Sequence, residues 1–162
     1  MNLRPELMPP ALDPALVARL AHLAATIDGA RPGEDEDALA EFNRLAGTSI
    51  PFDQFQGIYG GDGHEDYVRR VLYRQSLSPD PTLTRQEMAE IVSRIMTSAE
   101  GRDFYLELFQ VNCRHPSGTD LLFWPDLVPE LPRGRDPSAK EIADLALQGR
   151  SEPSINPDSN AR

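Results

Sequence analysis

The sequence is poor in cysteine and has no long apolar stretch. Cys113 is its one cysteine, so it offers neither an internal disulfide nor the paired cysteines of a zinc cluster. No apolar run approaches the roughly 20 residues that a membrane-spanning helix needs, and residues 1–10 lack the apolar stretch of a secretory signal. We therefore expect a protein of the cytoplasm with no contact to a membrane.

Basic residues are also scarce. The 162 residues include 16 lysines and arginines against 26 aspartates and glutamates, which gives a net charge of −10. A field of that sign repels phosphate backbones, which argues against direct binding of nucleic acid, and it attracts basic surfaces. Because acidity can also simply serve solubility, a basic protein partner is one of two interpretations. With 40% hydrophobic residues, the chain can build one ordinary domain or two small ones that share a core.

Helical spacing of apolar residues characterises the first half of the chain. Asp13 as N-cap and Pro14 at the first helical position predict a helix that runs to Asp28. Acidic residues at 34–37 predict the start of a second helix, because carboxylates in a first turn complement the helix dipole. The predicted elements are a helix over 14–28, a helix from 34 that closes at Gly47, a short turn after Pro51 and a helix over about 64–74.

A link at residues 76–81 separates the two halves. It contains two prolines and no apolar pattern, which is typical of a boundary. The sequence therefore predicts a helical N-terminal extension over 1–80 and a second domain over 81–150. Residues 151–162 are polar and are expected to be disordered.

The second half opens with the clearest helix signal in the chain. Thr84 and Glu87 have the spacing of a capping box, and apolar residues of 88–96 share one face. A second helix over about 103–113 has more apolar surface than one core face needs. Either it lies between other helices or its second side meets a partner.

The remaining elements are short. The apolar cluster at 121–124 can form at most one helical turn before Pro125 ends it, and Asp136 or Ser138 caps a last helix that ends at Gly149. No alternation typical of strands appears in the chain. We therefore predict an all-α protein.

Four pieces of the second half occur in a distinctive order: LTRQEMAEIVSRIM, a second helix, HPSGTDLLFWP and DPSAKEIADLAL. In order and spacing they resemble the colicin and pyocin DNase immunity proteins over about residues 82–150. The most specific piece is His115 to Pro125, which resembles the family's stretch nearly position for position. The resemblance implies an acidic four-helix domain whose third helix is one short turn, preceded here by the small helical N-terminal domain.

The resemblance also implies a binding module without chemistry. Such a bacteriocin immunity protein neutralises a toxin by tight, non-covalent binding of its basic nuclease domain next to the active site, and it uses no catalytic residue, metal or cofactor. In the family, the short third helix supplies shared contacts and the second helix tunes which toxin is recognised. The matching shared contacts are Ser117, Thr119, Asp120, Phe123, Trp124 and Pro125, and the outward positions of the second helix are Asp103, Leu106, Glu107 and Gln110.

Physical reasoning points to the same short segment. A one-turn helix exposes its first backbone N–H groups, and large aromatic side chains supply much of the binding energy at buried interfaces. Two features depart from the family: Phe123 and Trp124 replace the usual tyrosines, which leaves only the indole N–H as a donor, and the second helix is about one turn shorter, with its acidic start reduced to Glu100 and Asp103.

A purely structural role is the alternative for several of these residues. The cluster at 121–124 could be core, but we expect Leu121 or Leu122 inside and at least one aromatic exposed. His115 before Pro116 more often ends a helix than binds a metal. We expect Cys113 to be a small buried hydrophobic residue rather than a nucleophile.

Two other functions remain as alternatives. An acidic helical adaptor or regulatory protein would reuse the immunity fold to bind a non-toxin partner, and it would lose that partner when residues 1–80 are deleted. A small hydrolase would use His64, Asp66 or His115, and bound metal would favour it. For His64, Glu65 and Asp66 we expect helix capping and solvation instead.

Overall fold

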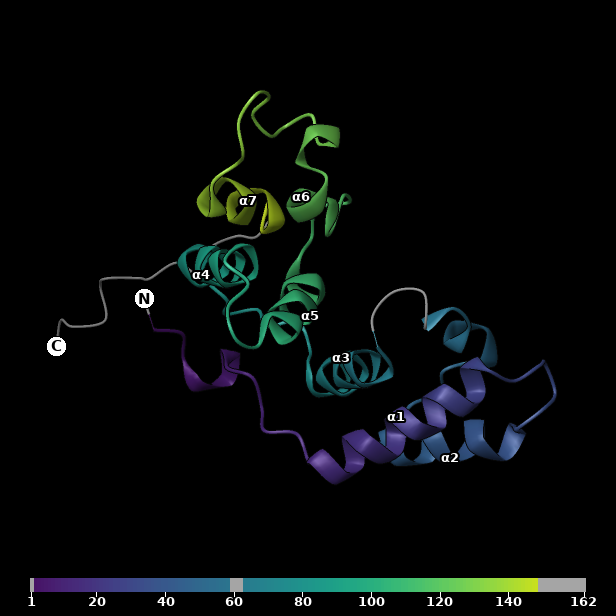
Figure 1. The fold of residues 1–162 in the computed structure, drawn as a ribbon. Coiled ribbons are helices and arrows are strands. Elements are labelled where there is room, and N and C mark those ends of the chain that lie inside the picture. Colours follow the sequence, from purple (N-terminus) through teal and green to yellow (C-terminus); the bar gives the residue numbers. More distant parts are fainter. Residues whose placement is uncertain (1, 59–62, 149–162) are drawn as a thin grey trace, which may run out of the picture. The chain divides into compact units, whose positions relative to one another are not determined.

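Figure 1 shows an all-helical chain in the computed structural model, which describes residues 2–58 and 63–148. Within these ranges no residue belongs to a β-strand, which confirms the predicted all-α class. The elements are η1 (Pro5–Leu7), α1 (Pro14–Asp28), α2 (Glu36–Ala46), η2 (Phe52–Phe55), α3 (His64–Ser76), α4 (Arg85–Met96), α5 (Arg102–Asn112), α6 (Asp120–Phe123), η4 (Pro125–Leu127) and α7 (Ala139–Ala146), where η denotes a 3-10 turn. The predicted disordered tail at 151–162 lies outside the described residues. None of the helices in the described ranges has the length and apolar character needed to cross a bilayer.

The described residues divide into two compact units. Residues 4–58 and 63–78 together with 101–108 form one, here called the N-terminal unit, and residues 2–3, 79–100 and 109–148 form the C-terminal unit. The chain leaves the N-terminal unit between Ser78 and Pro79, inside the link predicted at 76–81. Helix α5 is divided: residues 102–108 belong to the N-terminal unit, and residues 109–112 belong to the C-terminal unit.

Helix α1 begins and ends where the sequence predicts. Asp13 Oδ1 accepts a hydrogen bond from the backbone N–H of Ala15 at 3.0 Å, and Pro14 occupies the first helical position. Asp28 is the last helical residue. The cap satisfies one of the otherwise unpaired amides of the first turn, so this boundary is encoded locally.

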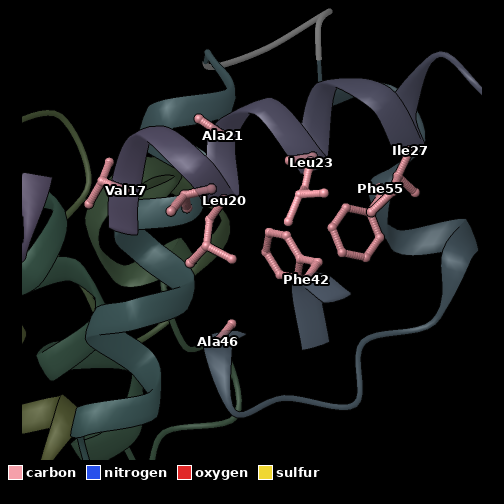
Figure 2. Packing of buried hydrophobic residues seen from close by; sticks show 10 residues of the cluster. Val17, Leu20, Ala21, Leu23, Ile27, Phe42, Ala46 and Phe55 are labelled. Atoms are coloured by element: carbon pink, nitrogen blue, oxygen red, sulfur yellow. The ribbon is translucent and has the colours of Figure 1, made fainter. Parts of the chain in front are cut away.

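The core of the N-terminal unit forms on one face of α1. Side chains at helical spacing are buried there: Val17, Leu20, Leu23, Ala24 and Ile27. Figure 2 shows Phe42 of α2 and Phe55 of η2 against Leu23 and Ile27. The two rings meet edge to face, with centroids 4.8 Å apart and an interplanar angle of 85°, an arrangement that aromatic pairs favour.

Helix α2 begins two residues later than the acidic run predicts. The Glu34 carboxylate accepts a hydrogen bond from the Arg31 backbone N–H at 3.0 Å, and Asp35 has a left-handed backbone with φ of 52°. Glu34 therefore closes the preceding loop, and the first helical residue is Glu36.

Capping boxes begin two helices of the C-terminal unit. At α4, the Thr84 hydroxyl accepts from the Glu87 backbone N–H at 3.1 Å, and the Glu87 carboxylate accepts from the Thr84 N–H at 2.9 Å. Ser138 and Glu141 exchange the same bonds at α7, so Ser138 is the cap and Asp136 is not. Helices α4 and α7 pack against each other.

Candidate functional site

The segment His115–Pro125 owes its shape to a tight turn. The backbone N–H of Gly118 donates to the His115 carbonyl at 3.0 Å, and Pro116 occupies the second position of the turn, which suits its fixed φ. Gly118 has φ of +51°, a left-handed backbone that favours glycine. The His115 Nδ1 atom accepts from the Ser117 N–H at 3.2 Å, so its ring braces the same turn.

One helical turn, α6, follows directly. The N–H groups of Asp120 and Leu121 donate to the carbonyls of Ser117 and Gly118 at 2.9 and 3.3 Å. The prediction that this short helix offers unused N–H groups is therefore wrong for these two residues, because the tight turn before the helix already supplies acceptors. What α6 presents to solvent is its side chains.

The side chains of α6 and of Trp124, which caps its C-terminal end, divide into a buried and an exposed set. Leu121 is fully buried, whereas Phe123 is 46% and Trp124 63% exposed, which confirms that one leucine lies inside and at least one aromatic outside. Leu127 in η4 is 73% exposed. Its N–H donates to the Trp124 carbonyl at 3.0 Å, so α6 and η4 are continuous. We call Asp120, Phe123, Trp124 and Leu127 the α6–η4 surface.

Asp120 adds a carboxylate to this surface. It is exposed, and no residue in the described ranges pairs with its carboxylate. Ser117, Thr119 and Pro125 are partly buried around the same turn. The six residues that the resemblance assigns to shared contacts therefore come together in one segment, and their role as contacts stays a prediction.

The four predicted positions on α5 have different surroundings. Gln110 is exposed, and Asp103 and Leu106 are partly buried. The side chain of Glu107 is only 8% exposed, and its Oε2 atom accepts from Arg74 Nε of α3 at 2.8 Å. Glu107 thus belongs to an internal ion pair of the N-terminal unit.

Other parts of α5 are held in the N-terminal unit as well. The ring of Phe104 packs edge to face on Tyr73 with centroids 5.4 Å apart. The Tyr105 hydroxyl lies 3.7 Å from the sulfur of Met8, and an added Cβ at Gly101 would approach Pro9 to 2.7 Å. The excess apolar surface of this helix is thus covered within the chain.

Two features of these surfaces carry no signal in the sequence. Leu127 lies in the proline-rich stretch PDLVPELP, residues 125–132, where the apolar residues have no helical spacing that would mark an outward side. The pair of Arg74 and Glu107 joins residues 33 positions apart, for which a single sequence carries no signal.

The polar residues proposed for hydrolysis or metal binding serve structural contacts. His64 Nε2 lies 3.0 Å from Asp28 Oδ2, and Asp28 Oδ1 accepts from the Gly57 N–H at 2.9 Å. Glu65 and Asp66 both pair with Arg69. Nowhere in residues 2–58 and 63–148 do three or more His, Cys, Asp or Glu residues gather closely enough to hold a metal ion.

Cys113 is half-buried at the end of α5. Burial raises the pKa of its thiol, and its Sγ atom lies 3.8 Å from the His115 carbonyl, which it faces as a weak donor. The pKa shift favours the thiol over the thiolate, the form that acts as a nucleophile.

Residues 81–151 match the family described as colicin immunity protein / pyocin immunity protein. This immunity-type segment contains all of α4, α5, α6 and α7, including the short third helix that the family resemblance implies. No curated protein and no solved structure matches the chain.

The match covers less than half of the chain, and it indicates an immunity-type binding role for the matched segment. Immunity proteins of this family act by binding, so the segment points to a bacteriocin as the partner. The α6–η4 surface and all ten contact residues predicted from the sequence lie on this segment. Residues 1–80 lie outside the matched range.

Proposed function

We propose that this protein binds and neutralises the nuclease domain of a bacteriocin in the cytoplasm of a bacterial cell. The binding is non-covalent, uses no cofactor and covers the toxin next to its active site. The observation that carries the proposal is the α6–η4 surface on the immunity-type segment, where two aromatic side chains and an unpaired carboxylate face solvent.

The exposed aromatics supply the affinity in this proposal. Phe123 and Trp124 project from a turn whose backbone is fixed by hydrogen bonds, so little conformational entropy is lost when a partner covers them. Tryptophan is among the residues that most often dominate binding energy at protein interfaces, and its indole N–H retains one donor. Partly buried Ser117, Thr119 and Pro125 surround the anchors.

The negative charge of the chain raises the rate at which it associates with a basic partner. A domain that handles DNA carries a basic surface, and a protein of net charge −10 attracts it over distances near the Debye length. Asp120 places one of these charges beside the aromatic anchors. The association rate constant should therefore fall with rising salt, and the dissociation rate should depend on the aromatics.

Helix α5 contributes secondary contacts. We propose Asp103, Leu106 and Gln110 as residues that adjust which toxin is bound, because their side chains are at least partly exposed. Glu107 would contribute indirectly, because its ion pair with Arg74 of α3 keeps α5 in position.

A pull-down with a matched control tests the proposal. The tagged wild-type protein is used in the native bacterium, captured proteins are identified by mass spectrometry, and the partner is then purified for affinity measurements and a DNA-cleavage assay. Wild type should recover a basic nuclease and inhibit its cleavage of DNA. Asp120→Ala/Trp124→Ala should weaken affinity by about thirtyfold or more, the effect of one interface hot spot.

The control variant loses one carboxylate and one exposed apolar side chain elsewhere. Asp37→Ala/Met96→Ala fits, because Asp37 is exposed in α2 and Met96 is 49% exposed at the end of α4. It should bind like wild type. Capture of a partner without nuclease activity, or equal affinity of the two double variants, would reject the proposed function or its surface.

A further inference from the structure

The exposed surface of the immunity-type segment continues past Pro125, where the contacts implied by the family resemblance end. Asp126 and Leu127 of η4 both face solvent, and Leu127, at 73%, is the most exposed large apolar side chain among the described residues. Gln110 is the one exposed residue of α5, and it is polar. A partner that contacts both regions therefore meets apolar side chains chiefly on α6 and η4.

Hydrogen bonds and buried neighbours fix the position of Leu127. The Val128 N–H donates to the Pro125 carbonyl at 3.0 Å, and the Leu131 N–H donates to the Val128 carbonyl at 3.1 Å. Val128 and Leu131 are only 2% and 4% exposed, so the chain is anchored in the C-terminal unit directly after Leu127. A side chain on a backbone fixed in this way loses little entropy when a partner covers it.

A second available carboxylate lies beside this side chain. Asp126 is exposed, and no residue within 2–58 and 63–148 pairs with its carboxylate. Glu130 follows in the same stretch, but its Oε1 atom lies 3.6 Å from His115 Nε2. Asp126 is thus the acid of η4 that a basic side chain of a partner can meet next to Leu127.

We propose that η4 carries a further anchor for the nuclease, in which Leu127 enters an apolar site on the nuclease surface and Asp126 meets a Lys or Arg side chain beside that site. The inference rests on the proposed function and adds what the partner must present: an apolar patch within its basic surface. Charge complementarity favours this occupant over a second copy of the chain, because two copies of net charge −10 repel each other.

The two residues should act on different rate constants. Contact between apolar side chains acts only at short range, so Leu127 should slow dissociation of the complex. A charge acts over the Debye length, so Asp126 should speed association at low salt.

The test measures binding of the full chain to the nuclease recovered in the pull-down, by surface plasmon resonance. Leu127→Ala should raise the dissociation rate constant by about tenfold, because it removes three carbon atoms from an apolar contact. Leu127→Met should bind nearly like wild type, since it keeps the apolar volume. Met96→Ala is the matched control, because Met96 is 49% exposed at the end of α4, and it should also bind like wild type.

The charge is tested separately. Asp126→Asn should lower the association rate constant by about twofold at low salt, and the difference should vanish near 1 M salt, where the Debye length is about 3 Å. Asp37→Asn removes the same charge from an exposed position in α2, and its effect should be smaller.

Several results would overturn the inference. Unchanged dissociation in Leu127→Ala would remove the anchor but leave the proposed function standing, provided that wild type still inhibits the nuclease. A faster dissociation accompanied by a lower urea midpoint would assign Leu127 a structural role instead. A wild-type dimer in sedimentation that Leu127→Ala dissociates would assign the patch to a second copy. Recovery of no basic nuclease by wild type would reject both the proposed function and this inference.

Discussion

The ion pair of Arg74 and Glu107 offers a direct test of how α5 is held. Arg74→Ala leaves the Glu107 carboxylate in place without its guanidinium partner. The side chain of Glu107 is 8% exposed and that of Arg74 59%, so the pair is open to solvent on one side. Breaking a buried pair costs about 3–5 kcal/mol, and an exposed pair contributes about 0.2–1 kcal/mol. We therefore expect the free energy of unfolding to fall by about 1–3 kcal/mol.

Urea unfolding followed by circular dichroism measures this change. The double variant Arg74→Ala/Glu107→Gln should be more stable than Arg74→Ala, because a neutral amide is less costly to bury without a partner than a carboxylate. Arg69→Ala is the control, since its acidic partners Glu65 and Asp66 are largely exposed. The reasoning is refuted if Arg74→Ala loses no more stability than Arg69→Ala, or if the double variant is the less stable one.

Three further predictions concern folding. A fragment of residues 79–162 lacks Tyr73 and Met8, which contact Phe104 and Tyr105 in the full chain. Because burial of each aromatic side chain stabilises by about 1.5–3 kcal/mol, the fragment should show no cooperative urea transition by near-UV circular dichroism. A urea midpoint equal to that of the full chain would contradict the role of these contacts in folding. Arg135 lowers the pKa of Glu141 from 4.5 to about 2, so the stability this pair brings is present above pH 4.5 and lost as pH falls toward 2. In Glu141→Gln the urea midpoint should therefore fall less than in wild type between pH 4.5 and pH 2. Equal decreases in the variant and the wild type would argue against this role of the pair. Thr84→Ala removes the α4 cap and should lower the free energy of unfolding by about 1 kcal/mol, with an unchanged urea midpoint as the contrary result.

Much of the helical order could be predicted because its signals are local. Asp13 with Pro14, and Thr84 with Glu87, fix helix starts through atoms at most three residues apart. The family resemblance and the physics of a one-turn helix together predict at least one exposed aromatic at 121–124, and the structure exposes both Phe123 and Trp124.

The surroundings of α5 could not be predicted in the same way. A helix with apolar side chains on two sides fits both a sandwiched helix and a helix that meets a partner, and only the tertiary packing of Phe104 and Tyr105 distinguishes them. The burial of Glu107 depends on Arg74, which approaches from a helix 33 residues earlier. Charge pairs of this kind leave no periodic pattern in one sequence.

The divided membership of α5 has an evolutionary consequence. Four of the eight residues from 101 to 108 are buried in the N-terminal unit, among them the charged Glu107. Substitutions there must satisfy internal packing before they can follow any change in a binding partner. Diversification toward a new partner within this stretch is therefore open chiefly to the residues that the packing leaves partly exposed, such as Asp103 and Leu106.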